Sequence, residues 1–181
     1  NIERVFSSQK LQLVDRSLLN SRFTLDRDAG FQLRHHFNVG KTFLIRTKLA
    51  VSQGEGLNRK SQSAGNGYTG RIELLPFGKF SKKGDYFASD LKREEKPKLM
   101  LSFTYDYNDN ALRSGGQMAQ DITGSTRDLQ NIQADAHFKY KGLSFFGEYA
   151  NRKTMDGIAV NELNEVYYTG SALNLQAGYL F

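Results

Sequence analysis

The sequence contains no cysteine, only two prolines and no long apolar run. The absence of cysteine excludes a disulfide framework and a thiolate metal site. A membrane-spanning helix needs about 20 consecutive apolar residues, so a helical membrane span is excluded as well. The few prolines and 17 glycines favour β-structure interrupted by flexible turns.

The chain has 181 residues, enough for one domain with a core, and we expect 1–181 to form a single domain. It opens at Asn1, with neither an initiator methionine nor the apolar core of a signal peptide. We therefore expect a processed chain or part of a longer polypeptide.

The net charge is +6, which raises the question of nucleic-acid binding. However, basic and acidic residues are interleaved, as in "DRD" at 26–28 and "KREE" at 92–95, and no long basic tract occurs. This charge pattern does not favour nucleic acid as a partner.

Apolar and polar side chains alternate strictly in several segments, which predicts β-strands. In residues 131–140 and 143–150 the alternation is interrupted only by Lys141-Gly142, which predicts two antiparallel strands joined by a tight turn. Most of these segments are close to the ten residues of a tilted membrane strand. The predicted strands are 30–37, 42–52, 68–77, 98–108, 131–140, 143–150 and 171–181.

The connections between these segments differ in length from one end of the predicted sheet to the other. Long connections rich in Gly, Ser and Asn cover 53–67, 109–130 and 153–170, and they alternate with tight turns at 38–40 and 141–142. Outer-membrane barrels have this layout, with extracellular loops and periplasmic turns. The connection 78–97 is long but falls on the short side, so we interpret it as an enlarged periplasmic turn that holds a helical turn.

The aromatic residues, 9 Tyr and 13 Phe, help to identify the solvent of the apolar face. Several lie near the ends of predicted strands, as expected for the aromatic girdles of a membrane barrel. A soluble lipocalin-like barrel with an aromatic core is the alternative. Strand length and the unequal connections favour a transmembrane, antiparallel up-and-down β-barrel, with about seven or eight strands in this chain.

Several blocks together resemble the phosphate-selective porin family (porins O and P) of Gram-negative outer membranes. They are "YTGRIELLPFGKFSKKGDYFASDLKREEKPKLMLSFTYDYNDNA" from Tyr68, "ADAHFKYKGLSFFGEYANRK" from Ala134 and the final "LNLQAGYLF". The amino-terminal "SSQKLQLVDRSLLNSRFTLDRDAGFQL" is similar to the stretch that leads from a constriction segment into a strand, so we expect 1–29 to be a constriction or loop segment.

This resemblance implies an outer-membrane barrel of roughly sixteen strands, of which the chain is a partial segment. It also implies contact with outer-membrane lipid, small anions as solutes and a homo-oligomer, a trimer by family resemblance. An eight-stranded closed barrel is the alternative, because Phe181 ends the last alternating segment as in complete outer-membrane proteins.

The polar face of the predicted sheet leans positive, and Arg and Lys rings lower the cost for an anion of losing water in a narrow passage. We expect Arg16 on the segment folded into the lumen. The alternative is that these residues pair with Glu73 or Glu148 across strands. They would then only satisfy the charged groups of a polar wall and would not select solutes. The predicted pore-lining residues are Arg16, Arg34, Arg46, Lys48, Arg71 and Lys139.

No pattern of catalytic residues occurs. His35 and His36 are adjacent and point to opposite faces of a strand, so they do not bind one metal ion together. Nucleophile-elbow, Walker and dinucleotide-binding fingerprints are missing. We expect neither an enzyme nor a cofactor or metal.

Two functions remain open on the sequence. The first is an outer-membrane porin for passive diffusion of small anionic or polar solutes, with phosphate-like anions among them. The second is a small non-transporting outer-membrane barrel with a structural or adhesion role through its extracellular loops.

Overall fold

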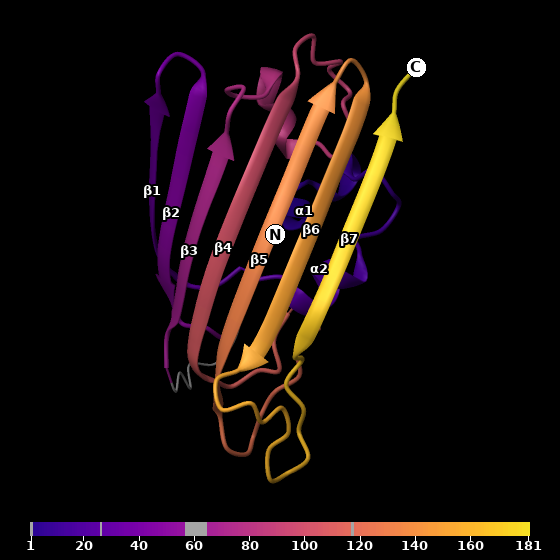
Figure 1. Ribbon diagram of the computed structural model, residues 1–181. Helices are drawn as coiled ribbons and strands as arrows, with labels where there is room; N and C mark the ends of the chain where they lie inside the picture. The colour runs from indigo at the N-terminus through magenta and orange to yellow at the C-terminus, as the bar shows by residue number, and fades with distance from the viewer. Residues whose placement is uncertain (1, 26, 57–64, 117) are drawn as a thin grey trace.

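Seven antiparallel strands form one sheet in the computed structural model, which describes residues 2–25, 27–56, 65–116 and 118–181 (Figure 1). Strands that are neighbours in the sheet are also neighbours in the sequence. The predicted all-β, antiparallel, up-and-down fold is therefore confirmed. The strands are β1 (Gly30–Val39), β2 (Phe43–Ser52), β3 (Gly67–Leu75), β4 (Lys98–Ala111), β5 (Arg127–Tyr140), β6 (Leu143–Thr154) and β7 (Gly170–Tyr179).

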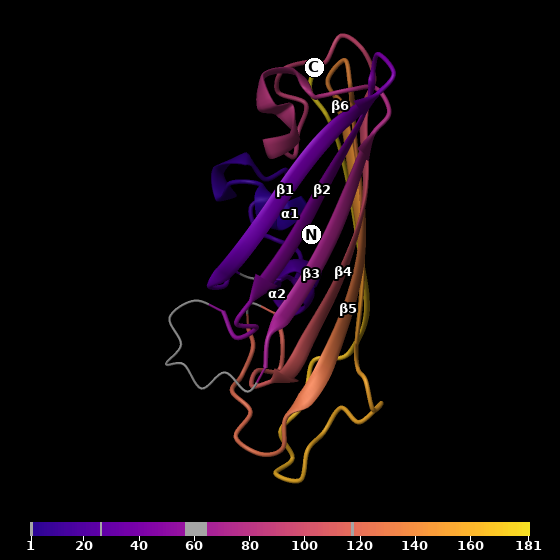
Figure 2. The same cartoon turned by 90° about the vertical axis from the view of Figure 1, so that its left-hand side faces the viewer.

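The sheet is not closed into a barrel by the described strands. β1 and β7 lie at opposite edges, and neither pairs with the other. The strands curve gently around the amino-terminal segment, which lies on one side of them (Figure 2). An eight-stranded barrel has room only for its own side chains, whereas this sheet holds whole chain segments on that side. The seven strands therefore do not form the small closed barrel that the sequence left open.

The turn between β5 and β6 lies where it was predicted. Lys141 and Gly142 both have positive φ, at 48° and 92°. Positive φ at both central residues is the requirement of a type I′ turn, whose twist matches that of the flanking strands. The pair therefore fixes the register of β5 and β6.

Several predicted strand boundaries differ from the observed ones by one to four residues. The first turn was expected at 38–40, but β1 continues through Val39, and Gly40 with φ 70° begins the turn. A β-branched valine fits a strand better than a turn, whereas glycine adopts positive φ at little cost. The strand expected at 68–77 ends before Pro76, which has no N–H to donate to the ladder.

Long and short connections lie at opposite ends of the sheet, as the sequence predicted. The connections that follow β2, β4 and β6 lie at one end, and the tight turns after β1 and β5 lie at the other (Figure 1). Residues 57–64 of the predicted loop 53–67 lie outside the described residues. The connection 78–97 lies at the end of the tight turns and contains the 3₁₀ helix η2 (Ser81–Tyr86), so the expected helical turn is present.

The two faces of the sheet have opposite polarity and opposite burial. We call the face that carries Arg34, Asp135 and Glu148 the polar face, and the other the apolar face. On the polar face, Asp135 is 4% exposed and His137 is completely buried. On the apolar face, Phe31 is 90% exposed. This is the reverse of a water-soluble sheet, in which the apolar face is buried.

The helices cover only the polar face. α1 (Ile2–Val5), η1 (Ser8–Lys10), α2 (Leu18–Phe23) and η2 all lie on this side of the sheet (Figure 2). α2 begins after Ser17, whose hydroxyl accepts a hydrogen bond from the amide of Asn20. Among the described residues, no helix has the length and apolar character to cross a membrane.

A small apolar cluster joins the cover to the sheet near the end with the tight turns. It is formed by buried side chains of α1, the connection 78–97 and the polar face of β2, β3, β4 and β6. Phe6 packs edge-on against Phe146, with ring centroids 5.5 Å apart. The cluster consists of Ile2, Phe6, Leu44, Leu75, Phe80, Ala88, Met100 and Phe146.

The connections after β4 and β6 fold against each other at the opposite end. Tyr167 is buried with Ala111, Ile122 and Leu129, and its hydroxyl donates to the carbonyl of Ala111 at 2.8 Å. These two connections therefore form one packed unit.

Glu165 is the main polar link in this unit. Its carboxylate accepts hydrogen bonds from the Thr123 hydroxyl at 2.6 Å, the Gly124 amide at 3.0 Å and the Asn161 side chain at 2.7 Å. These donors stabilise the charged form and lower the pKa of Glu165 to about 2 from its usual 4.5. The link is thus strongest when the carboxylate is ionised.

We expect acid to loosen this link. Because the pKa is lower in the folded state, the stabilisation is fully present above pH 4.5 and is lost as the pH falls towards 2. Hydrogen exchange of peptides that span Thr123 and Gly124, corrected for intrinsic rates, should show a loss of protection in this window. In Glu165→Gln the protection should be lower already at pH 6 and change less with pH. Protection that stays constant down to pH 2 in the parent would contradict the assignment.

Candidate functional site

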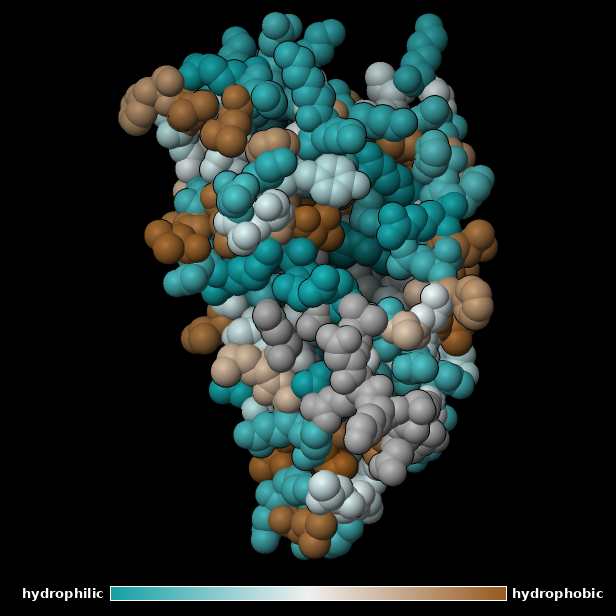
Figure 3. All heavy atoms as spheres, turned by 180° about the vertical axis from the view of Figure 1, so that it is seen from behind, coloured by the Kyte–Doolittle hydropathy of each residue, from teal (hydrophilic) through white to brown (hydrophobic). Residues whose placement is uncertain are grey.

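A groove whose charged lining residues are mainly basic runs along the polar face between β1–β3 and the segments that cover this face. Its wider part, beside η2, encloses about 920 Å³, and an adjoining part beside Leu25 encloses about 510 Å³. Figure 3 shows this side of the molecule, where hydrophilic residues gather. We call it the basic groove. Its charged lining residues are Arg4, Lys10, Arg27, Arg34, Arg46, Lys48, Arg71, Lys79, Lys82 and Lys83, with Asp28, Glu73 and Asp85.

Strand register brings three of the predicted pore-lining residues together. Arg46 lies opposite Glu73 and Lys48 lies opposite Arg71 in the ladder between β2 and β3. The Glu73 carboxylate is 2.6 Å from Lys48 Nζ, 2.9 Å from Arg71 Nε and 3.6 Å from Arg46 Nη1. Three cations therefore share one carboxylate. This is the arrangement expected under the alternative in which these residues only pair across strands.

Arg71 is the most constrained of these cations. It also donates to the hydroxyl groups of Thr104 and Ser102, each at 2.8 Å, and pairs with Asp135. Its side chain is 11% exposed and that of Asp135 is 0% exposed. Such a pair orders the middle of the sheet, because each charge is held by several partners at once.

Arg46 extends the network to the cover of the polar face. Its guanidinium lies 2.9 Å from Asp85 in η2, thirty-nine positions further along the chain. This contact could not be predicted from the sequence, because Asp85 lies in a connection and not in an alternating segment. Arg46 thus ties the connection 78–97 to β2.

Arg34 differs from the other three. It lies on β1 directly opposite Lys48, it is exposed, and its side chain bonds to Gln32. No carboxylate of the described residues is paired with it. Arg34 therefore carries positive charge that the strands around it do not offset.

Three lysines of the connection 78–97 add to this uncompensated charge, and sequence reasoning missed them. Lys79, Lys82 and Lys83 line the wider part of the groove. Lys82 and Lys83 have φ of 48° and 61°, an uncommon conformation for residues other than glycine. The basic segment "KFSKK" at 79–83 could have indicated these lysines. However, it does not alternate as a strand does, so its side chains could not be assigned to a face.

Their turn is held rigidly from both sides. Glu94 accepts hydrogen bonds from the amide and the hydroxyl of Ser81, at 2.6 and 2.8 Å. Lys139 donates to the carbonyl groups of Gly84, Phe87 and Ser89, each at 2.8 Å. These contacts stabilise the left-handed backbone of the two lysines.

The structure places Lys139 beneath this connection and not in the open groove. Its side chain is fully covered, and it is only 1% exposed. Arg16 lies on the segment that covers the polar face, where its guanidinium donates to the carbonyl groups of Glu3 and Phe6. Of the six predicted residues, Arg34, Arg46, Lys48 and Arg71 therefore lie together, whereas Arg16 and Lys139 lie apart and fix chain segments.

The amino-terminal segment is fastened to the polar face at two places. At α1, the amide of Glu3 donates to Glu148 at 2.6 Å. After α2, the carbonyl oxygen of Phe23 accepts from Asn131, Gln133 and Arg152. The segment is thus held on the polar face. Its role as a constriction, which the family resemblance implies, stays a prediction.

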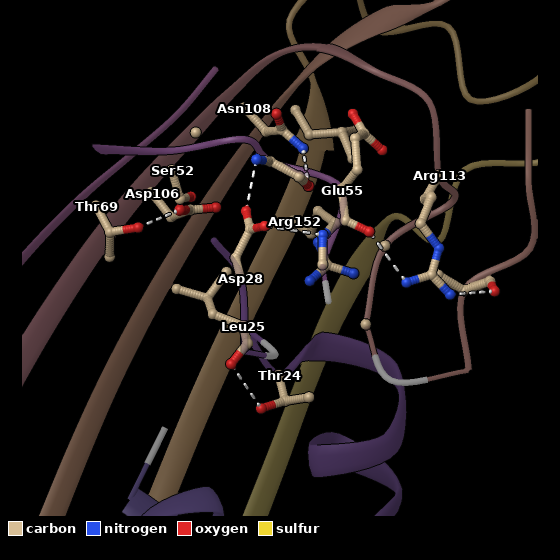
Figure 4. A pocket seen from close by; sticks show the side chains of 17 residues that line it. Thr24, Leu25, Asp28, Ser52, Glu55, Thr69, Asp106, Asn108, Arg113 and Arg152 are labelled. Atoms are coloured by element: carbon tan, nitrogen blue, oxygen red, sulfur yellow. Dashed lines mark hydrogen bonds between the residues drawn. The ribbon is translucent and has the colours of Figure 1, made fainter. Parts of the chain in front are cut away.

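A second, smaller cavity of about 110 Å³ lies near the loop end of the sheet (Figure 4). Asp28 accepts hydrogen bonds there from the amides of Gly54 and Gly56, and Asp106 accepts from the Thr69 hydroxyl at 2.7 Å. These carboxylates therefore hold strand and loop together. No three His, Asp or Glu side chains in the described part of the chain are grouped to hold a metal ion.

Comparison with known proteins gives no further evidence about this site. No family model matches the chain, and no curated protein or solved structure was found to be similar to it. The functional conclusion therefore depends on the geometry of the chain itself.

Proposed function

We propose that this chain is part of an outer-membrane β-barrel porin through which small anionic or polar solutes diffuse passively. The observation that carries the proposal is the reversed polarity of the sheet. Its polar face holds buried charged side chains. Its apolar face exposes large apolar side chains, among them Leu173, which is 66% exposed. Lipid is the solvent for which such an apolar surface is favourable, and an aqueous lumen suits the polar face.

The strand lengths and connections support the same proposal. The strands have between 9 and 14 residues, which is long enough to span a bilayer when tilted. In hydrocarbon, the free N–H and C=O groups at the edges of β1 and β7 need partners. We therefore propose that further strands pair with both edges, in a barrel of roughly sixteen strands such as the phosphate-selective porins form.

The basic groove supports a preference for anions. Arg34, Lys79, Lys82 and Lys83 face the groove, and none of them is in an ion pair in the described structure. At an effective dielectric constant of about 20, one such charge attracts an anion at contact distance by up to roughly 4 kcal/mol. Because Glu73 and Asp85 neutralise the neighbouring cations, we propose a general preference for small anions, phosphate-like anions included.

Ion selectivity tests this proposal. We expect the full-length polypeptide in a planar bilayer to show an anion-selective reversal potential under a KCl gradient. The variant Arg34→Gln, Lys82→Gln, Lys83→Gln should shift that potential towards zero, because it removes charge from the groove without breaking an ion pair.

The matched control is Lys41→Gln, Lys96→Gln, Lys153→Gln. It removes the same charge from exposed positions that do not line the groove. Its reversal potential should equal that of the parent. Cation selectivity in the parent, or equal shifts in both variants, would refute the assignment of the groove.

A non-transporting barrel is the second candidate, and the packed loop unit around Tyr167 and Glu165 favours it. Ordered extracellular loops provide a defined surface for adhesion. A folded, membrane-inserted protein that shows no conductance would support this candidate over the porin.

A further inference from the structure

The wall of the basic groove that the connection 78–97 forms carries aromatic side chains that the proposed function does not use. Phe80 packs into the buried apolar cluster, whereas Tyr86 and Phe87 line the groove outside that cluster. Tyr86 is 48% exposed. The face of an aromatic ring carries partial negative charge, so it does not attract a small inorganic anion. These two rings therefore suit a solute of another kind.

Contacts on both sides of Tyr86 hold this wall in place. The preceding residue, Asp85, is paired with Arg46 of β2 at 2.9 Å. The carbonyl oxygen of the following residue, Phe87, accepts a hydrogen bond from Lys139 Nζ at 2.8 Å. The backbone on either side of Tyr86 is thus fixed before a solute arrives, so a solute that packs on its ring does not have to order a loop.

Positive charge lies next to these rings. The ammonium group of Lys10 lies over the ring of Phe87, 4.1 Å from its centroid, in a cation–π contact. Lys82 and Lys83 belong to η2 itself, and Arg34 lines the same part of the groove from β1. A solute in the wider part of the groove therefore meets an aromatic surface and cations together.

We propose that the wider part of the basic groove binds small anions that carry an aromatic ring, with aromatic carboxylates as the class. This inference rests on the proposed function, because it assigns a class of solute to the same groove. The carboxylate pairs with Lys82, Lys83 and Arg34, and the ring packs offset or edge-on against Tyr86. The enclosed volume of about 920 Å³ lies within the range of about 300–1,000 Å³ that is usual for small-molecule sites. It leaves room for both parts of such a solute.

Two probe anions of equal charge separate the effect of the ring from that of the charge. Benzoate and cyclohexanecarboxylate each carry one carboxylate on a six-membered ring, but only the ring of benzoate is aromatic. We expect both to reduce the chloride current of the full-length polypeptide in a planar bilayer. Because an aromatic pair adds binding energy beyond its buried area, benzoate should act at a concentration roughly 2- to 12-fold lower.

The same bilayer separates failure of this inference from failure of the proposed function. Equal effects of the two probe anions, or no effect of either, in a channel that selects chloride over potassium would overturn the inference and leave the porin intact. A parent channel without anion selectivity would refute the proposed function, and the inference with it.

The variant Tyr86→Leu tests whether this ring is the one that contacts benzoate. It keeps an apolar side chain and the charge of the groove, so benzoate and cyclohexanecarboxylate should then act at the same concentration. The matched control is Tyr149→Leu, which removes a tyrosine of similar exposure, 43%, from β6 outside the groove. It should keep the preference for benzoate. A preference that survives in Tyr86→Leu, or is lost in both variants, would overturn the inference.

The charge-removing variant Arg34→Gln, Lys82→Gln, Lys83→Gln tests the other half of the site. Both probe anions use the same cations, so both should act at higher concentrations in this variant, by the same factor, and benzoate should stay the more effective. Unchanged concentrations for both anions would mean that these cations do not contact the carboxylate, which would overturn the inference.

Discussion

Replacing Arg71 with alanine is expected to lower the free energy of unfolding by about 3–5 kcal/mol, the usual cost of removing one partner of a buried ion pair. The Asp135 side chain is 0% exposed and pairs with Arg71 at 2.5 Å. After the substitution, the Asp135 carboxylate would keep the hydrogen bond from the Ser102 hydroxyl but would lose the Arg71 guanidinium. Glu73 would lose one of its three cations at the same time. Equilibrium unfolding by denaturant in lipid vesicles measures the difference.

Arg34→Ala is the matched control for this substitution. Arg34 has the same chemistry and lies on the same face, but it is exposed and pairs with no carboxylate of the described residues. We expect a change within about 0.5 kcal/mol, as for other surface substitutions away from special features. Equal effects of the two substitutions would mean that the Arg71 network does not stabilise the sheet.

This difference between Arg34 and Arg71 changes how the charges of the polar face are interpreted. The sequence presents Arg34, Arg46, Lys48 and Arg71 as equivalent members of one positive strip. The structure shows three of them around Glu73, where their charge is balanced by Glu73, Asp85 and Asp135. The positive charge that no carboxylate offsets therefore comes from Arg34 and from lysines outside the strands, and this is the charge that an anion would meet in the proposed porin.

Much of the fold was predictable, because apolar and polar side chains must alternate along a strand whose two faces have different surroundings. Residues 131–140 show the period of two without interruption, and 98–108 show it with Met100 as an apolar exception on the polar face. Both segments lie in strands. The extensions of β4 to Ala111 and of β5 back to Arg127 were missed. Polar residues dominate there and resemble a loop in composition, and the pairing shifts register between Asn108 and Ala111.

The candidate site was only partly predictable, for a related reason. Alternation assigns each side chain to a face of the sheet. Because strands that follow each other in the sequence pair in an up-and-down sheet, the grouping of Arg46, Lys48 and Arg71 follows from the sequence. The contacts of Lys139 and Arg16 do not follow. Each binds carbonyl groups of a distant or irregular segment, and such partners depend on how the connection 78–97 and residues 2–25 fold back over the sheet.

The substitution Phe103→Arg is expected to lower the stability of the membrane-inserted protein by about 2–4 kcal/mol. Phe103 is the third of five outward residues in β4 that begin at Leu99 and end at Tyr107, so it lies at the centre of the apolar face. If lipid covers that face, an arginine there must be buried in hydrocarbon or must draw water into it. The measurement is the free energy of folding into lipid vesicles, from denaturant titration.

Depth and location provide two controls for Phe103→Arg. Leu99 lies at the end of the same row. Leu99→Arg should lower the stability of the inserted protein by only about 0–1 kcal/mol, because the arginine side chain reaches the headgroups there. Leu163→Arg changes an exposed leucine in the connection after β6, outside the strands, and should have little effect. The order Phe103, Leu99, Leu163 is therefore the expected ranking of destabilisation. A flat series would mean that the apolar face does not lie in a bilayer, and a parent protein that stays folded and monodisperse without detergent would lead to the same conclusion.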